Sequence, residues 1–380
     1  MSIYSRRPGA IGAALLVPIL LLTSCGSAEP ATQPDPHTGH PAGGAPPPTI
    51  PLRAGERFVE LSMPEAYTPQ APDGGSDEYR CFLVDPGLTT DAYLMGSQFQ
   101  PQNAAIVHHA IFFRIDPPDA GTARDTDARD DGPGWTCFGN AGIGEDPTWV
   151  ASWAPGGNET LIGENLGYPM PAGSLLVMQV HYNLSGGGGS DRSGIRLRLS
   201  DGGAGFRPLA SMRLAAPVEL PCAATESGDL CDRTAAVADV TKRFGPPARR
   251  VLTGLERLCG EPDAGPAQHC DRKVTKPGTV HALGGHMHLL GRSIRIELNP
   301  GTPRARTLLD IPSYNFDDQA LRTLAAPVSI EDGDTLRVTC THDAGLRAQL
   351  PALKDTPPRY VVWGEGTADE MCLGLVVLTR

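Results

Sequence analysis

The stretch "AAIVHHAIFFRI", residues 104–115, indicates the structural class of the chain. It is a short apolar run rich in β-branched residues, which is typical of a strand. Similar runs flank it: "RFVEL" (57–61), "EYRCFLVD" (78–85), "SLLVMQVHYNL" (174–184) and "GIRLRLS" (194–200). Polar segments such as "PPDAGTARDTDARDDGPG" (117–134) separate the runs and are expected to be turns. No segment shows an i, i+3, i+4 apolar pattern of helical length, so the sequence predicts an all-β chain.

A second series of strand-like runs begins after "SDGGAGFRP" (200–208) and includes "TVHALGGHMHLLGRSIRIEL" (279–298) and "DTLRVTCTHD" (334–343). The chain has 380 residues, with 45 glycines and 37 prolines. That length suits two domains, and that composition suits short strands joined by many turns. We therefore expect two domains, residues 53–203 and 204–380.

The first 24 residues have the pattern of a bacterial lipoprotein signal peptide. Arg6 and Arg7 precede the apolar core "IGAALLVPILLL", and "LTSC" (22–25) resembles a lipobox, which makes Cys25 the expected lipidation site. An ordinary signal peptide with an incidental cysteine is the alternative. The apolar core is shorter than the ~20 residues that span a bilayer. We expect an exported protein, lipid-anchored to a bacterial membrane, with residues 25–52 as a Pro/Gly-rich tether.

Charge and cysteine content narrow the class of protein further. The formal net charge is −11, and no Lys/Arg cluster is present, which argues against a nucleic-acid partner and against electrostatic docking on anionic lipid. Nine cysteines, one of them Cys25, leave an even number, which in an exported chain indicates disulfides. Four of these lie in a Cys-rich insert, residues 222–275, where we expect the local bridges Cys222–Cys231 and Cys259–Cys270.

Three histidines in the first half are candidate metal ligands. His108 and His109 are neighbours in an apolar run, and neighbours on a strand point to opposite faces. Both rings reach one ion only at a bulge or a strand end; otherwise one ring is buried and bonded while the other faces solvent. His181 lies in a second apolar run, "VMQVHYNL". Three imidazoles suit copper and zinc equally well.

In the second half, "HALGGHMHLLGRS" (281–293) contains His286 and His288. On a strand, residues i and i+2 share a face, so both rings can bind one ion, whereas His281 is expected to be structural or to support a ligand. Met371, in "DEMC", is either a soft ligand that favours Cu(I) or a core residue.

Five motifs occur in an order and spacing that resemble the copper type II, ascorbate-dependent monooxygenases: "IVHHAIFF", "MQVHYN", "HMHLLGR", "GDTLRVTCTHD" and "TADEMC". The resemblance covers most of residues 58–380, except the Cys-rich insert. It implies two jelly-roll-like β-sandwich domains in tandem, with one copper ion in each. By motif, His108, His109 and His181 correspond to the ligands of an electron-transfer copper. His286, His288 and Met371 correspond to the ligands of the copper at which O2 and substrate react.

The resemblance also implies a Cys340–Cys372 bridge and a Cys81–Cys137 bridge. The chain departs from the peptide-processing relative, which reads a substrate carboxylate through an Arg where this chain has Gly284. Leu373 and Leu375 replace an Asn and a Tyr of the same relative. We therefore do not expect peptide amidation, and we expect a less polar substrate.

The leading hypothesis is a copper monooxygenase that hydroxylates a substrate C–H bond with O2 and a reductant such as ascorbate. A non-catalytic copper-binding lipoprotein is the alternative, and a zinc hydrolase is disfavoured because HExxH is absent and Met is a poor zinc ligand. We expect a solvated acidic loop around Met371, formed by Glu365, Asp369 and Glu370. Tyr182, Gln179 and His342 are candidates to hydrogen-bond the ligands.

Overall fold

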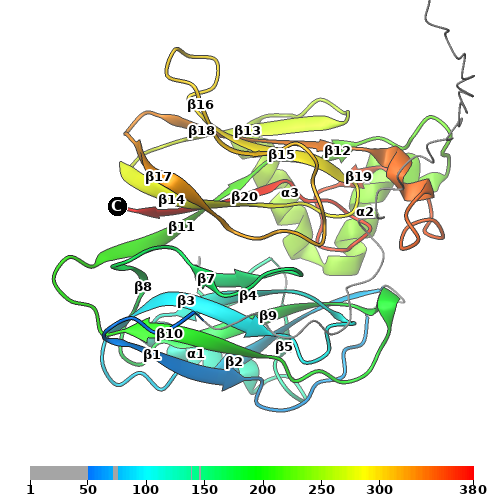
Figure 1. Cartoon of the computed structure of the whole chain (residues 1–380). Coiled ribbons are helices and arrows are strands. Elements are labelled where there is room, and N and C mark those ends of the chain that lie inside the picture. Colours follow the sequence, from blue (N-terminus) through cyan, green and yellow to red (C-terminus); the bar gives the residue numbers. More distant parts are fainter. Residues whose placement is uncertain (1–49, 72–75, 138, 145–146) are drawn as a thin grey trace, which may run out of the picture. The chain divides into compact units, whose positions relative to one another are not determined.

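The run that contains His108 and His109 forms strand β4 (Val107–Ile115) of a five-stranded sheet in the computed structural model (Figure 1). The structure describes residues 50–71, 76–137, 139–144 and 147–380. The order of this sheet is β5-β2-β9-β4-β6. Its other strands are β2 (Asp77–Val84), β5 (Trp135–Thr136), β6 (Thr148–Trp153) and β9 (Leu175–Asn183).

A nine-stranded sheet runs through both halves of the chain, in the order β1-β10-β3-β8-β11-β20-β14-β17, with β7 (Thr160–Leu161) paired to β3. Its strands are β1 (Glu56–Ser62), β10 (Gly194–Ser200), β3 (Ala92–Gln100), β8 (Leu166–Met170), β11 (Arg207–Ala215), β20 (Leu373–Thr379), β14 (Gly278–His286) and β17 (Arg322–Ile330). A short parallel pairing of β8 with β11 joins the two halves, whereas the other pairings in the sheet are antiparallel.

Two smaller sheets complete the second half. One has the order β13-β18-β15-β16, and the other pairs β12 with β19. The strands are β12 (Glu219–Leu220), β13 (Ala267–Lys273), β15 (Gly291–Leu298), β16 (Arg306–Ile311), β18 (Thr335–His342) and β19 (Val361–Val362). In β18, buried and partly exposed residues alternate, as expected for a strand with one face on a core.

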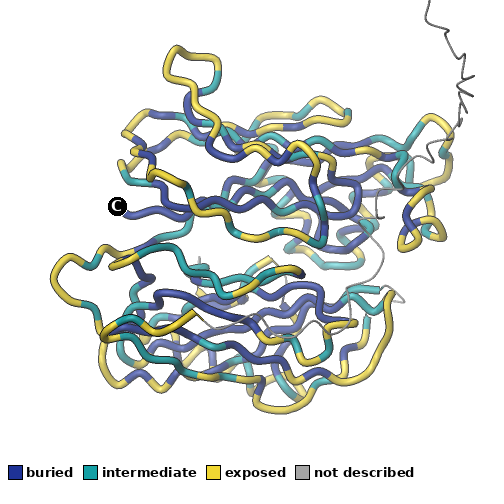
Figure 2. Tube along the Cα trace, viewed as in Figure 1, coloured by how far each residue is buried: buried dark blue, intermediate teal, exposed yellow. Residues whose placement is uncertain are grey.

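The sheets pack face to face, and buried side chains follow the strands (Figure 2). One core, which includes Phe82, Phe112 and Leu197, lies in the first half, and another, which includes Ile294, Val338 and Val376, lies in the second. The prediction of a mostly β, sandwich-like fold is confirmed. The jelly-roll connectivity stays a prediction. So does the boundary near residue 204, which falls inside the compact unit Pro36–Arg380.

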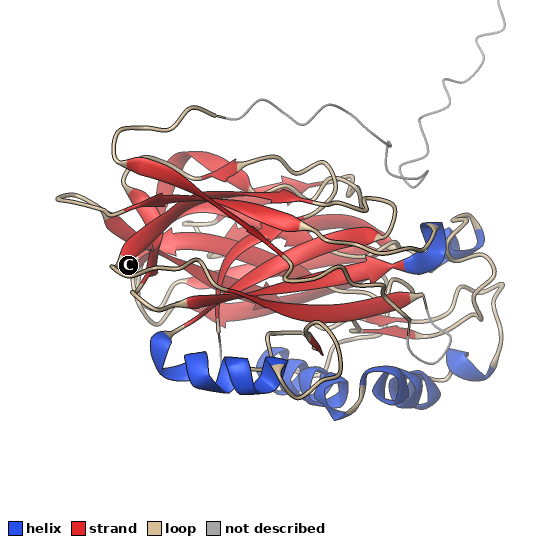
Figure 3. Ribbon diagram, turned by 90° about the horizontal axis from the view of Figure 1, so that it is seen from below, coloured by secondary structure: helices blue, strands red, loops and turns tan. Residues whose placement is uncertain are grey.

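Helices also form, in segments that were expected to be a polar turn and a disulfide-stapled insert. The polar segment 117–134 contains the 3-10 turn η2 (Pro117–Asp119) and helix α1 (Ala120–Asp127). The Cys-rich insert contains η4 (Asp229–Cys231), α2 (Arg233–Phe244) and α3 (Pro246–Cys259). Further 3-10 turns are η3 (Leu184–Gly186) and η5 (Ala344–Ala348). Figure 3 shows most of the helices along one side of the strands.

Local signals in the insert explain its helices. The Asp232 side chain caps α2 by accepting a hydrogen bond from the Ala235 amide. Gly245 ends α2 with φ 75°, a conformation that other residues adopt at a cost, and prolines follow at the start of α3. Val251, Leu255 and Leu258 in α3 have the i, i+4, i+7 spacing of an apolar helix face. This spacing contradicts the expectation that no segment has a helical apolar pattern.

Among the described residues there are four disulfides: Cys81–Cys137, Cys222–Cys231, Cys259–Cys270 and Cys340–Cys372. These are the pairings that local spacing and the family resemblance implied. The expected signal peptide, Cys25 and nearly all of the tether lie outside the described residues. Within the described part of the chain, none of the helices is both long enough and apolar enough to cross a bilayer.

Candidate metal centres

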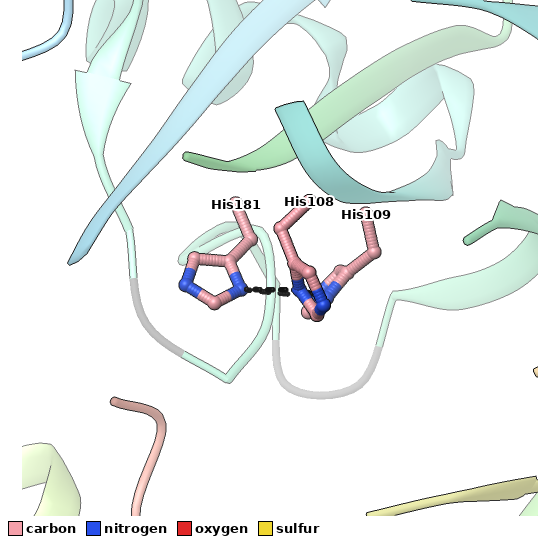
Figure 4. A group of neighbouring side chains, drawn as sticks. All are labelled: His108, His109 and His181. Carbon is pink, nitrogen blue, oxygen red and sulfur yellow. Dashed lines mark hydrogen bonds between the residues drawn. The ribbon is translucent and has the colours of Figure 1, made fainter. Parts of the chain in front are cut away.

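His108, His109 and His181 form a cluster of buried imidazoles on adjacent strands β4 and β9 (Figure 4). His109 pairs with His181 across the strands, and the register shifts between Val107 and His109. This irregularity makes His108 an extra residue, so both neighbouring rings turn to the same side. The bulge that a shared metal site requires is present.

The three Nδ1 atoms are 3.1, 3.2 and 3.4 Å apart. Three imidazole nitrogens that bind one ion tetrahedrally at about 2 Å lie roughly 3.3 Å apart, so the spacing fits a metal site. Hydrogen bonds alone cannot account for all three Nδ1–Nδ1 contacts. Each Nδ1 is either a donor or an acceptor, so at least one contact must join two donors or two acceptors. A single cation is complementary to three inward lone pairs.

Asp77 on β2 fixes the orientation of one of these rings. The Nε2 of His181 donates to Oδ1 of Asp77 at 2.9 Å, which leaves the lone pair on Nδ1, inside the triangle. Tyr79 stacks on the His181 ring with 4.2 Å between ring centroids. Asp77 also accepts hydrogen bonds from Ser76 and from the amide and hydroxyl of Thr367. The carboxylate therefore links the histidine cluster to the segment that carries Met371.

Burial keeps the histidines in the neutral form that binds metals. It lowers the pKa of His109 well below its ordinary value, with a further contribution from the neighbouring histidines. It also lowers the pKa of His181, although Asp77 opposes the shift. Burial alone would raise the pKa of Asp77, but the hydrogen bonds from His181, Thr367 and Ser76 hold it at about 2.

His286 and His288 were expected to lie along one strand. Instead they lie at and just beyond the end of β14. His286 is the last residue of β14, and His288 follows it in the connection to β15. Their ring centroids are nevertheless only 5.2 Å apart.

Hydrogen bonds at Nδ1 leave Nε2 of both rings as the acceptor. Gln319 donates to the Phe316 carbonyl, so its Oε1 accepts from Nδ1 of His286. Nδ1 of His288 donates to the Asp369 carbonyl at 3.1 Å. The Nε2 of His288 is buried without a hydrogen-bond partner in the described part of the chain. A buried, unsatisfied acceptor is costly unless a ligand binds it.

Glu370 holds the segments of His288 and Met371 together. Its Oε2 accepts from the His288 amide at 2.9 Å and from the Met371 amide at 3.2 Å, and its Oε1 accepts from the Leu290 amide. The Cys340–Cys372 bridge ties the same segment to β18.

The prediction of a solvated acidic loop is wrong, because Glu365, Asp369 and Glu370 are all buried. Asp369 is compensated by Arg243 of α2 through two hydrogen bonds of 2.8 and 2.6 Å. Glu370 is compensated by the backbone amides that it accepts from. Burial, with the charge of Asp369, raises the pKa of Glu365 to about 8.

One open cavity of about 930 Å³ reaches both histidine groups. Its wall includes His109, His286 and Met371, and the His109 and His286 ring centroids are 5.3 Å apart. His288 is not among the described residues that line it. Gly284, Leu373 and Leu375 also belong to the wall, so the positions that differ from the peptide-processing relative face this space.

The remaining candidates have different roles. His281 is buried at a register shift of β14 and hydrogen-bonds to Thr379, which is a structural role. Tyr182 donates to Asp191, and Gln179 donates to the Asn140 carbonyl. His342 lies 3.4 Å from the Met371 carbonyl. The residues that support the imidazoles, Asp77, Gln319 and Thr367, had no recognisable signal in the sequence, because strand register and loop packing bring them to the site.

Residues 266–378 match the family profile "Copper type II ascorbate-dependent monooxygenase, C-terminal domain". This part of the chain is therefore similar to the C-terminal domain of that copper monooxygenase family. It contains His286, His288 and Met371, and it excludes α2, α3 and the three histidines of the first half. The family indicates copper chemistry with O2 and an ascorbate-type reductant at this segment.

No curated protein is significantly similar to the chain in sequence. Among solved structures, the major capsid protein P2 of bacteriophage PM2 aligns with 85% of this chain and 97% of its own, at 8% identity and a TM-score of 0.30. The VP2 subviral particle of infectious bursal disease virus aligns with 90% of this chain and 75% of its own, at 10% identity and a TM-score of 0.18. These similarities are too weak to indicate a shared fold or function.

Proposed function

We propose that the chain is a copper-dependent monooxygenase that hydroxylates a substrate C–H bond with O2 and an external reductant. The overall change is R–H + O2 + 2 electrons + 2 protons → R–OH + H2O, with both electrons supplied by a reductant such as ascorbate. The observation that carries the proposal is the single cavity whose wall holds His109, His286 and Met371.

Residues His108, His109 and His181 would hold one copper ion, and His286, His288 and Met371 would hold the other. Bound copper would supply one-electron redox chemistry at both positions, and the Met371 thioether would favour the Cu(I) form. Residues 53–203 and 204–380 are then two copper domains.

The chain's own residues provide orientation and charge control. Asp77, Gln319 and the Asp369 carbonyl fix which nitrogen of His181, His286 and His288 carries the proton. Glu365 lies in the cavity wall with a pKa of about 8, so it is able to hold and release a proton near neutral pH. The apolar wall around Leu373 and Leu375 positions a substrate and limits water.

The test is metal content and ascorbate-dependent oxygen uptake for wild type, His109→Ala and Met371→Ala. Two coppers per chain are expected for wild type, and each variant should lose or perturb a different one. His269→Ala, at an exposed position of β13, is the matched control. Two coppers with no oxygen uptake above free copper, across a broad substrate panel, would favour the non-catalytic copper-binding alternative.

The exported, lipid-anchored location stays part of the proposal. Cys25 would carry the lipid, and residues 25–52 would hold the copper domains away from the membrane. Globomycin-sensitive processing and loss of membrane association in Cys25→Ser would test it.

A further inference from the structure

The Cys-rich insert contributes a wall of the cavity. Helix α3 places Val251, Leu255 and Leu258 along it, and Leu258 is one of few large apolar side chains exposed in the described residues. Helix α3 ends at Cys259, before the matched family segment begins at residue 266. This part of the cavity therefore lies outside the matched family segment.

An arginine without a partner lies on the same wall. On β13, Gln268 and Cys270 are buried and Arg272 is half-buried, whereas Ala267, His269, Asp271 and Lys273 are exposed. Arg272 therefore shares the inner face on which Cys270 bridges to the end of α3. Within the described part of the chain, its side chain makes no hydrogen bond or ion pair. A half-buried guanidinium of this kind is available to an anionic ligand.

The other charges of the wall do not neutralise Arg272. Arg213 and Arg380 also line the cavity, and the acids there are Glu159 and Glu365. The Glu159 carboxylate is bonded to the buried Arg198 at 2.7 Å. Burial keeps Glu365 protonated below about pH 8. Among the described residues of the wall, no unpaired carboxylate therefore opposes an anion at Arg272.

We propose that the cavity binds an amphipathic organic anion, with its carboxylate at Arg272 and its apolar body along α3 and Leu375. The insert then selects the substrate by chemical class, an apolar carboxylate. This inference rests on the proposed monooxygenase function in one respect, because it treats the bound anion as the substrate.

The test uses decanoate as the probe, with decyltrimethylammonium as its cationic counterpart, in calorimetric titrations of the whole chain with and without copper. Decanoate should bind, and the cation should bind at least tenfold more weakly. Arg272→Gln should weaken decanoate binding at least tenfold, and Arg272→Lys should restore part of it. Lys273→Gln, which removes the same charge from the exposed face of β13, should change the affinity less than twofold. Leu258→Ser should weaken decanoate binding severalfold.

Equal affinity for both probes, absence of decanoate binding, or wild-type affinity in Arg272→Gln would overturn the inference. A failure of the proposed function looks different. Arg272-dependent binding of decanoate without a hydroxylated product, in the copper-loaded chain with ascorbate, would support the anion site and contradict monooxygenation of that ligand. Copper-dependent hydroxylation of neutral compounds, with decanoate binding unchanged in Arg272→Gln, would contradict the anion site and leave the monooxygenase function supported.

Discussion

The two histidine groups differ in how much of each site the strands build. His108, His109 and His181 lie on two paired strands, and their Nδ1 atoms are 3.1–3.4 Å apart. His286 ends a strand, while His288 and Met371 lie in connections held by Glu370 and by the Cys340–Cys372 bridge. The first group is assembled by sheet register, and the second is assembled by loop contacts.

This difference matches the two tasks in the proposed reaction. A site that only exchanges electrons benefits from fixed ligands, because little reorganisation then accompanies the change in charge. A site that must admit O2 and a substrate benefits from ligands on segments at the edge of a cavity. We therefore expect the first site to resist changes in the loops and the second to depend on them.

The largest effect is expected from removing a ligand of the rigid site. His181→Ala deletes one nitrogen of the triangle and leaves the buried Asp77 without its main partner. The first copper should bind at least 100-fold more weakly, and the second should stay bound. Copper content after dialysis against a chelator measures this, with His269→Ala as control. Retention of both coppers would contradict the assignment.

Arg243→Met tests the dependence of the second site on the insert. The variant removes both hydrogen bonds between Arg243 and the buried Asp369 and leaves Asp369 with a longer ion pair to Arg359 at 3.8 Å, and breaking such a buried pair costs about 3 kcal/mol. The unfolding free energy should fall by that amount, and the second copper should bind more weakly, because the Asp369 carbonyl orients His288. Arg295→Met, which breaks an exposed pair with Asp310, is the control and should cost less than about 1 kcal/mol. Weaker binding of the first copper, with binding of the second copper unchanged, would contradict the expectation that the insert supports the second site.

Asp77→Asn sharpens the comparison, because Asp77 contacts both regions. Loss of the carboxylate beside His181 should lower copper affinity at the first site about 10- to 100-fold. Competition with a chelator, followed by Cu(II) spectroscopy, measures this affinity. Asp85→Asn, at an exposed position just after β2, is the matched control. Unchanged affinity in Asp77→Asn would show that the carboxylate does not set the ring orientation.

Glu365→Gln is expected to have the smallest effect, which appears as a pH dependence. The pKa of Glu365 is raised to about 8 in the folded chain, so folding favours the protonated form. This stabilisation is complete below the unfolded pKa of about 4.3 and is lost as pH rises towards 8, at about 1 kcal/mol per pH unit. Copper-free wild type should lose stability relative to Glu365→Gln between pH 5.5 and 7.5 in urea unfolding. The exposed Glu261→Gln should follow wild type, and parallel curves for all three chains would refute the raised pKa.

The fold class could be predicted because the strand tendency of apolar β-branched runs, such as residues 104–115, is visible in the local sequence. Helix α3 differs from the expected all-β pattern, although Val251, Leu255 and Leu258 have helical spacing in the sequence. The candidate ligands could be chosen from the sequence because adjacent histidines in an apolar run are costly to bury without a role. Asp77, Gln319 and Glu370 could not be assigned, because their contacts depend on register and on loop packing that no local pattern encodes.

The most direct test of the account is copper content combined with Cu K-edge X-ray absorption of the reduced, copper-loaded chain. Two coppers per chain are predicted, with a sulfur ligand on one of them. The sulfur signal should disappear in Met371→Ala and persist in His109→Ala. A single copper per chain, or two coppers with only nitrogen and oxygen ligands, would contradict the assignment of two different copper sites on one cavity.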